Sequence, residues 1–320
     1  MLKYKTNNLL INAEVNQYLE SIIQTKLFAN GYIFYGAEGV GKKETALNFI
    51  KQIFKQYSLN GNVEEKINNK NHPDFLIIEP SSFIKGKKTK SVDSQNPIIN
   101  NMGIIKIEQI RNVKTFLNQK SIDSEKKIVL IVDAHLLNEA ASNCLLKTLE
   151  EPSNGIFILL TSKLNLLLDT ITSRCQLIRF KSFSSTQLDY FLQNNLDPSM
   201  LEIAKNLNSK DLVNSANGSP GNLFKNIEIW QELSEEITNK LHFPLKDNWE
   251  ILKVCKSISE KLEIYQQICL INLIQQIWWR KTRNINLVKK LETLKSHIKN
   301  HIQPRLAWEV TLLKIAIEDL

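Results

Sequence analysis

The segment 36–42 has the residue types of a phosphate-binding loop. It reads G-A-E-G-V-G-K, and its candidate anion-binding residues are Gly36, Gly39, Gly41 and Lys42. Glycines let backbone N–H groups converge on an anion at the start of a helix, and the lysine adds a positive charge. The apolar residues 31–35 predict a strand before the loop, and the pattern in 44–57 predicts a helix after it. Strand, loop and helix in this order favour a phosphate site.

The residue after the lysine argues against a metal–nucleotide complex. A loop of this kind places Ser or Thr there, so that the hydroxyl can bind Mg²⁺. This chain has Lys43 instead, and its ammonium repels a cation. Thr45 cannot take over, because two residues along a helix correspond to a rotation of about 200°. We therefore expect no magnesium site and no firm cofactor, and whether the loop still binds ATP is left open.

A second segment, 127–180, predicts the centre of a parallel sheet. The continuous apolar runs 128–132 and 156–160 are typical of strands buried on both faces, and 176–180 fits a third strand. Between the first two runs, Asn138 is a candidate helix cap, and apolar residues then recur at helical spacing until Pro152. Strand, helix, strand, short helix and strand predict half of a doubly wound α/β fold.

Two other polar features are not assigned a binding role. His72 has no Cys or His at ligand spacing, so we expect a structural residue rather than a metal ligand. A cluster of lysines lies in a segment rich in Ser, Gly and Asn, where a solvated loop is favoured over a DNA contact. The cluster consists of Lys85, Lys87, Lys88 and Lys90.

The composition is that of a soluble globular protein. The 320 residues can form two or three domains, and 42% of them are hydrophobic and 23% charged. No apolar run reaches the roughly 18 residues of a membrane span, and the first residues do not resemble a secretory signal. The net charge of +8 fits either a polyanionic partner or simple solubility. Four scattered cysteines indicate a reduced, cytoplasmic location without a disulfide framework or zinc site: Cys144, Cys175, Cys255 and Cys269.

The residues after Phe180 predict helices only. Ser184 or Ser185 can cap the first of them, and the cluster 217–222 is a turn signal. The segment 241–248 contains Pro244 and little periodicity, so it is a plausible linker. Trp278 and Trp279 are interpreted as core residues of a helical bundle. Two apolar faces are expected, one with Ile264, Ile268, Ile271, Ile274 and Trp278, the other with Leu306, Val310, Leu313 and Ile317.

Several short strings resemble the delta-prime subunits of bacterial DNA polymerase III, which are clamp-loader proteins of the AAA+ class. The most specific is N-C-L-L-K-T-L-E-E-P from Asn143, followed by S-R-C from Ser173. Weaker strings are G-A-E-G-V-G-K, H-P-D from His72, I-K-I-E-Q-I-R from Ile105 and P-R-L-A-W-E from Pro304. The resemblance implies a P-loop AAA+ α/β domain over 1–181, a small helical lid over 182–242, and an all-helical collar over 243–320 that builds a ring.

The resemblance also distinguishes ATP-hydrolysing motor subunits from stators. Motors resemble D-E-A-H at the end of the strand before the long helix, and the first acid binds Mg²⁺. Here the aligned residues are Val132 and Asp133, and Asp133 is expected to point to the opposite face, as adjacent strand residues do. A sensor arginine of the motors corresponds to Gly221. The zinc module of many delta-prime sequences is missing, because 51–74 contains no cysteine.

One catalytic group is retained under the resemblance. Arg174, in S-R-C, corresponds to an arginine finger offered to ATP on a neighbouring subunit, whereas an arbitrary arginine at this place is a surface residue. Glu150 and Glu151 oppose the dipole of the preceding helix, which indicates either a partner or simple exposure to solvent.

The preferred hypothesis is therefore a non-hydrolysing stator of the clamp loader. Its implied partners are the gamma/tau motor subunits, the delta subunit, the sliding clamp and primed DNA, with no membrane. Two alternatives stay open. The first is an ATP-hydrolysing motor that uses Asp133, and the second is a DNA-binding AAA+ adaptor outside replication that uses the lysine cluster.

Overall fold

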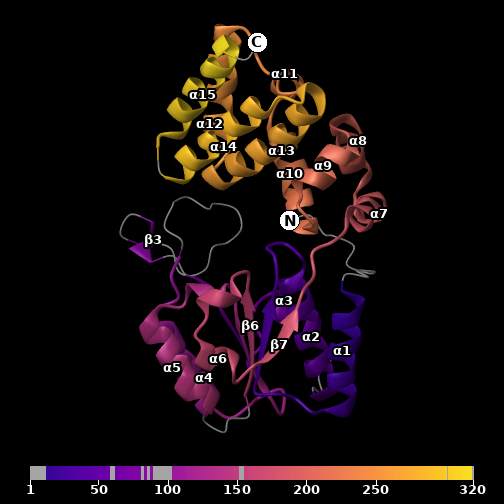
Figure 1. Cartoon of the computed structure of the whole chain (residues 1–320). Coiled ribbons are helices and arrows are strands. Elements are labelled where there is room, and N and C mark those ends of the chain that lie inside the picture. The colour runs from indigo at the N-terminus through magenta and orange to yellow at the C-terminus, as the bar shows by residue number, and fades with distance from the viewer. Residues whose placement is uncertain are drawn as a thin grey trace. The chain divides into compact units, whose positions relative to one another are not determined.

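The structure is a computed structural model in which residues 12–57, 62–80, 83–84, 87–88, 103–150, 155–300 and 302–318 are described. Its described part divides into an α/β unit that ends at Lys181 and a helical unit that begins at Ser182 (Figure 1). The three domains inferred from the sequence, with boundaries at 181 and 242, stay a prediction.

A five-stranded parallel sheet forms the centre of the α/β unit, which confirms the predicted fold class. Its order is β2-β5-β6-β1-β7, so each neighbouring pair requires a crossover connection. The strands β1, β5 and β6 are buried along nearly all of their length, as expected of continuous apolar runs. The bounds are β1 Gly31–Tyr35, β2 Phe75–Ile78, β5 Lys127–Ile131, β6 Gly155–Thr161 and β7 Gln176–Arg179.

Helices cover both faces of this sheet, as Figure 1 shows. One face carries α1 Ala13–Thr25, α2 Lys42–Tyr57 and α3 Val63–Asn68. The other carries α4 Ile107–Asn118, α5 Glu139–Glu150 and α6 Asp169–Thr172, with the 3₁₀ turns η1 Ala134–Leu136 and η2 Leu164–Leu166 beside them. Helix α1 ends at Thr25, because Lys26 adopts a left-handed conformation with φ of 57°.

The lysine cluster is only partly described. Lys87 and Lys88 form the short strand β4, which pairs antiparallel with β3, Phe83–Ile84. These two residues thus lie in a hairpin, and the preference for a solvated segment over a DNA contact stays a prediction. Lys85 and Lys90 lie outside the described residues.

The helical unit contains no strand among its described residues, 182–300 and 302–318. Ser184 caps α7 as expected, because its hydroxyl accepts a hydrogen bond from the Gln187 N–H. Ser219 caps α10 in the same way, next to Gly218, whose φ is 75°. The helices are α7 Ser185–Asn195, α8 Pro198–Leu207, α9 Ser209–Ser215, α10 Pro220–Glu232, α11 Glu235–Lys240, α12 Asn248–Lys261, α13 Ile264–Thr282, α14 Ile285–Lys299 and α15 Pro304–Glu318.

Buried tryptophans fix the core of the helical unit. Trp278 on α13 is 1% exposed and its indole N–H donates to the Leu241 carbonyl at 2.8 Å. Trp308 on α15 is fully buried and donates to Gln267 at 3.0 Å. Trp278 is thus a core residue as predicted, whereas Trp279 is 37% exposed and does not belong to the core.

Helix α15 buries a different face from the one that its sequence suggested. The buried residues are Ala307, Trp308, Thr311, Leu312 and Ile315. Leu306, Val310 and Ile317 are instead 51%, 43% and 77% exposed. Because apolar residues lie on most of the circumference of this helix, the bulky Trp308 decides which side enters the core. The other side remains an exposed apolar stripe.

The H-P-D segment before β2 is structural. His72 stacks on Phe54, with ring centroids 4.1 Å apart, and its Nδ1 accepts the Asp74 N–H at 3.2 Å. Asp74 is fully buried, and its carboxylate accepts three backbone N–H groups of the loop 122–124 at 2.7–3.2 Å. The carboxylate therefore ties this loop to the start of β2, and His72 is a packing residue as expected.

Replacing Asp74 with Asn should lower the stability of the α/β unit. The amide keeps the size of the side chain but replaces a charged acceptor of three N–H groups with a neutral, weaker one. We expect the free energy of unfolding to fall by about 2 kcal/mol, measured by denaturant titration. The exposed control Asp169→Asn should change it by less than about 0.5 kcal/mol. Equal effects of the two variants would contradict this account of the loop.

Candidate functional site

The glycine-rich loop has the backbone conformation that its sequence predicts. Gly39 and Gly41 have φ values of 72° and 92°, a region that favours glycine. Gly36 has φ of 153°, and a Cβ there would lie 2.3 Å from the Phe180 carbonyl oxygen. The loop runs from the carboxyl end of β1 into the first turn of α2, and the Gly36 N–H donates to the Thr161 carbonyl of β6. The predicted phosphate-binding residues are therefore assembled in one loop.

Lys42 folds back onto this loop. Its Nζ donates to the carbonyl oxygens of Gly36 and Ala37, at 2.7 and 2.5 Å. Burial lowers the pKa of Lys42, and the nearby carboxylates of Asp133, Glu38 and Glu44 counteract only part of that effect. The ammonium lies within the loop, where it can meet an anion bound by the loop amides.

Lys43 is engaged elsewhere. Its Nζ lies 2.8 Å from Glu79 Oε1, directly after β2, and Lys70 approaches the other carboxylate oxygen at 3.1 Å. The Glu79 side chain is only 14% exposed, and its backbone carbonyl accepts from Gln109 at 2.9 Å. Burial alone would raise the pKa of Glu79, but the contacts with Lys43 and Lys70 outweigh it, so its pKa is lowered. The residue in the place of a metal-binding hydroxyl is a fixed cation.

Val132 and Asp133 follow β5, and of the two only Asp133 carries a group that could bind a cation. Val132 packs against the apolar core on the α2 side of the sheet. Asp133 is not in the strand, because β5 ends at Ile131 and Asp133 has φ of 50°. The argument from strand alternation therefore does not apply to it. Partial burial raises the pKa of Asp133, although His135, Lys42 and Lys43 each act to lower it.

The sequence reasoning missed three groups at this edge of the sheet. Thr161, at the end of β6, is fully buried, and its hydroxyl lies 3.3 Å from His135 Nδ1 and accepts the Lys163 N–H. Burial lowers the pKa of His135, against the charge of Asp133. Glu79 was missed as well. A polar residue at or directly after the end of a buried strand is the signal that identifies Glu79 and Thr161, since the carboxyl ends of parallel strands meet at one edge. His135 follows β5 by four residues and has no such signal.

Arg174 lies on a different part of the unit, after α6. Buried neighbours anchor its turn, because Ile171 is fully buried and Cys175 packs in the core beneath β1. Burial raises the pKa of the Cys175 thiol to about 11, so this cysteine is a neutral packing residue. The Arg174 side chain is 39% exposed. A rigid turn thus presents a guanidinium at the surface.

Two acceptors hold the guanidinium of Arg174. Its Nη2 lies 2.6 Å from Glu150 Oε1, and its Nη1 donates to the Thr170 carbonyl at 3.0 Å. Glu150 is the last residue of α5, where a negative charge opposes the helix dipole. The ion pair offsets that cost and gives Glu150 a partner within its own chain. Glu151 lies outside the described residues.

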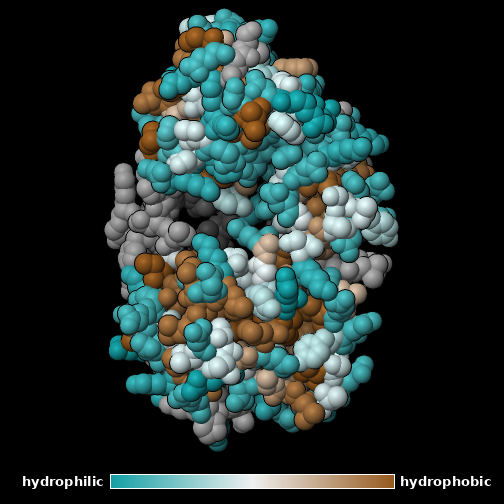
Figure 2. All heavy atoms as spheres, in the orientation of Figure 1, coloured by the Kyte–Doolittle hydropathy of each residue, from teal (hydrophilic) through white to brown (hydrophobic). Residues whose placement is uncertain are grey.

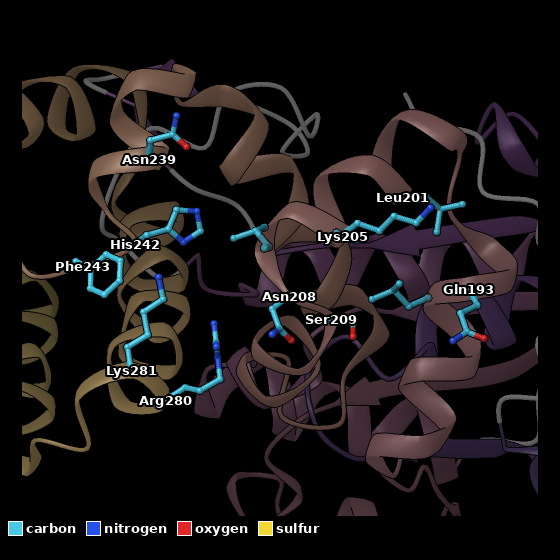
Figure 3. Close-up of a pocket in the computed structure, with 13 residues that line it drawn as sticks. Gln193, Leu201, Lys205, Asn208, Ser209, Asn239, His242, Phe243, Arg280 and Lys281 are labelled. Atoms are coloured by element: carbon cyan, nitrogen blue, oxygen red, sulfur yellow. The ribbon is translucent and has the colours of Figure 1, made fainter.

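A groove of about 850 Å³ lies in the helical unit, and Figure 3 shows its lining. Arg280 and Lys281 of α13 face Asn208 and Ser209 across it. Arg280 makes a bidentate pair, at 2.8–3.0 Å, with the buried carboxylate of Asp211, so its charge is neutralised. Lys281 lies 3.7 Å from the centroid of the Phe243 ring. These contacts tie helices together and do not form an anion site.

Within the described residues, no three His, Cys, Asp or Glu side chains are grouped so that they could hold a metal ion. A search of the same residues finds no helix with the length and apolarity needed to span a bilayer.

Comparisons with known proteins identify the family. The family model "DNA polymerase III, delta subunit" matches residues 11–184, and the model of the cyanobacterial delta-prime C-terminal domain matches 188–315. The DNA polymerase III subunit delta' of Bacillus subtilis is 27% identical over 207 residues, which is 62% of this chain and 56% of the relative. The subunit delta' of Pseudomonas aeruginosa is 30% identical over 154 residues, 46% of this chain and 42% of the relative. The chain thus spans about half the length of these relatives.

A solved structure supports the architecture. A DNA polymerase III gamma subunit-related protein of Thermotoga maritima superimposes with a TM-score of 0.56 at 16% identity, over 94% of this chain and 98% of that one. Parallel sheet, glycine-rich loop and helical carboxyl-terminal part define a AAA+ protein with a P-loop. Within that class, the two family models assign the chain: it belongs to the DNA polymerase III delta-prime family.

The ion pair of Glu79 should make stability depend on pH. Its folded pKa is lowered, so the pair stabilises the fold above the ordinary glutamate pKa of about 4.3 and loses its effect as pH falls through the lowered value. Glu79→Gln should reduce the free energy of unfolding by about 1–2 kcal/mol at pH 7, and the difference from wild type should shrink below about pH 4. Denaturant titrations at both pH values measure this. A difference that is the same at pH 7 and pH 3 would show that the pair does not act through charge.

Proposed function

We propose that the chain is a non-hydrolysing subunit of the DNA polymerase III clamp loader. It holds a ring of subunits in register and helps the ring to load the sliding clamp onto primed DNA. Its contribution to ATP hydrolysis is made through a neighbour, by Arg174. The chain is not an enzyme by itself, and its partners are the gamma/tau motor subunits and the delta subunit.

The observation that carries this proposal is the Lys43–Glu79 ion pair, at 2.8 Å, together with the packed Val132. A motor needs a hydroxyl and a carboxylate at these two places to bind Mg²⁺, and phosphoryl transfer depends on that metal for charge neutralisation. Here one place holds a cation and the other an apolar side chain. Both magnesium contacts are therefore lost together, while the glycine loop is kept.

Arg174 supports the second half of the proposal. An exposed guanidinium on a rigid turn suits the negative charge that develops on a phosphoryl group bound by another subunit. In Figure 2, apolar side chains gather over the part of the α/β unit where Figure 1 draws α5, β6 and β7. Leu166 and Leu168, between β6 and α6, are 56% and 38% exposed. Apolar surface beside the finger suits contact with a neighbouring subunit.

The helical unit supports assembly. We assign residues 182–242 to a lid and 243–320 to a collar that forms the ring. The exposed stripe of α15, with Leu306, Val310 and Ile317, offers a row of apolar side chains at helical spacing for this purpose. Gly221, the second residue of α10, stands in the place of a motor's sensor arginine, so the lid adds no charge at that position.

One observation favours the alternative of an ATP-hydrolysing motor. Asp133 lies close enough to Lys42 for each to act on the pKa of the other, so a carboxylate is present near the loop. Without a hydroxyl beside it, this carboxylate would have to hold Mg²⁺ through waters. The DNA-binding adaptor has no such support, because half of its lysine cluster lies outside the described residues.

Two variants in the reconstituted assembly separate the functions. Arg174→Ala should lower ATP turnover by about 10³-fold or more at the neighbouring site, because a finger is worth roughly 10³–10⁵ in rate. Lys42→Ala should leave turnover and clamp loading nearly unchanged, since a stator does not use its own loop for hydrolysis. The measurement is steady-state ATPase and clamp-loading activity of the whole assembly. The opposite pattern, with Lys42 essential and Arg174 dispensable, would identify a motor.

A further inference from the structure

The ion pair between Arg174 and Glu150 bears on how the finger is controlled. Both Nη atoms of the guanidinium are engaged, one by Glu150 at 2.6 Å and one by the Thr170 carbonyl at 3.0 Å. These atoms are also the ones that a guanidinium uses for bidentate recognition of phosphate. Each Nη atom of Arg174 therefore already has an acceptor within its own chain.

Glu150 and a neighbour's phosphate compete for the same Nη2 atom of this guanidinium. A carboxylate 2.6 Å from Arg174 would lie close to the incoming phosphate oxygens, and like charges at such distances repel. The Glu150 side chain is 52% exposed, so it can swing into water without opening the core. Exchange of one anion for another keeps the guanidinium paired in both states.

We propose that Glu150 is a latch for the arginine finger: it holds Arg174 against its own chain until the phosphate of ATP on the adjacent subunit displaces it. This inference rests on the proposed function of Arg174 and adds a regulatory residue to it. The exposed position of the pair keeps the latch weak, because such pairs are screened by solvent. A weak latch delays engagement of the finger and does not prevent it.

If Glu150 is a latch, removing its charge should free Arg174 to bind phosphate. In the reconstituted assembly, Glu150→Gln should raise kcat/KM for ATP about two- to fivefold, the range that an exposed ion pair provides. The affinity of the assembly for a non-hydrolysable ATP analogue, measured by equilibrium binding, should rise by a similar factor. The control Glu20→Gln makes the same charge change at an exposed position of α1 and should alter neither quantity.

A double variant isolates the pair. If Glu150 acts through Arg174, Glu150→Gln should have no effect in an Arg174→Ala background. Thermal unfolding of the free chain checks that the variants fold, and Glu150→Ala provides a second truncation. A fall in kcat/KM on Glu150→Gln would make Glu150 a support that orients the finger, and no change would make the pair incidental. Both results overturn the latch while leaving the finger intact, whereas an inert Arg174→Ala overturns the proposed function and the latch together.

Discussion

One ion pair carries the proposed function: the ammonium of Lys43, paired with Glu79, belongs to the residue where the resemblance to motor subunits expects a metal-binding hydroxyl. Lys43 extends from the first turn of α2 to Glu79 at the end of β2, and the carboxylate is largely buried and shared with Lys70. If the Lys43 ammonium were displaced, the largely buried carboxylate of Glu79 would keep only Lys70 as an ion-pair partner. The loop of glycines and Lys42 beside it is nonetheless intact. The fold thus keeps the glycine-rich loop and its lysine, and the proposed function is that the two contacts for Mg²⁺ are lost.

The same sheet places the remaining reactive group elsewhere. Arg174 follows α6 on a turn anchored by Ile171 and Cys175, and its guanidinium is paired at the surface. A cation at a surface, with exposed leucines in the preceding segment, is suited to act on another molecule. In the proposed function, loss of the internal site and retention of the external group belong together, because the chain would then contribute to a reaction that takes place on a neighbour.

Local patterns in the sequence predict most of the fold. The parallel strands, the Ser184 cap and the role of His72 follow from apolar runs and capping residues, because these features involve neighbours along the chain. The outward face of α15 and the partner of Glu150 cannot be predicted from local patterns, because both depend on contacts between residues that are far apart in the sequence. For α15, Trp308 enters the core and turns Leu306 and Val310 outward. Glu79 escaped notice because its partner Lys43 is 36 residues away.

The most direct test of the central claim is the effect of magnesium on ATP binding by the purified chain. The account predicts that affinity, measured calorimetrically in Mg²⁺ and in EDTA, is the same within about twofold for wild type. Restoring both contacts with Val132→Asp and Lys43→Thr should make binding magnesium-dependent. A wild-type chain that binds ATP tenfold or more tightly with Mg²⁺ than with EDTA would contradict the claim that its metal site is lost.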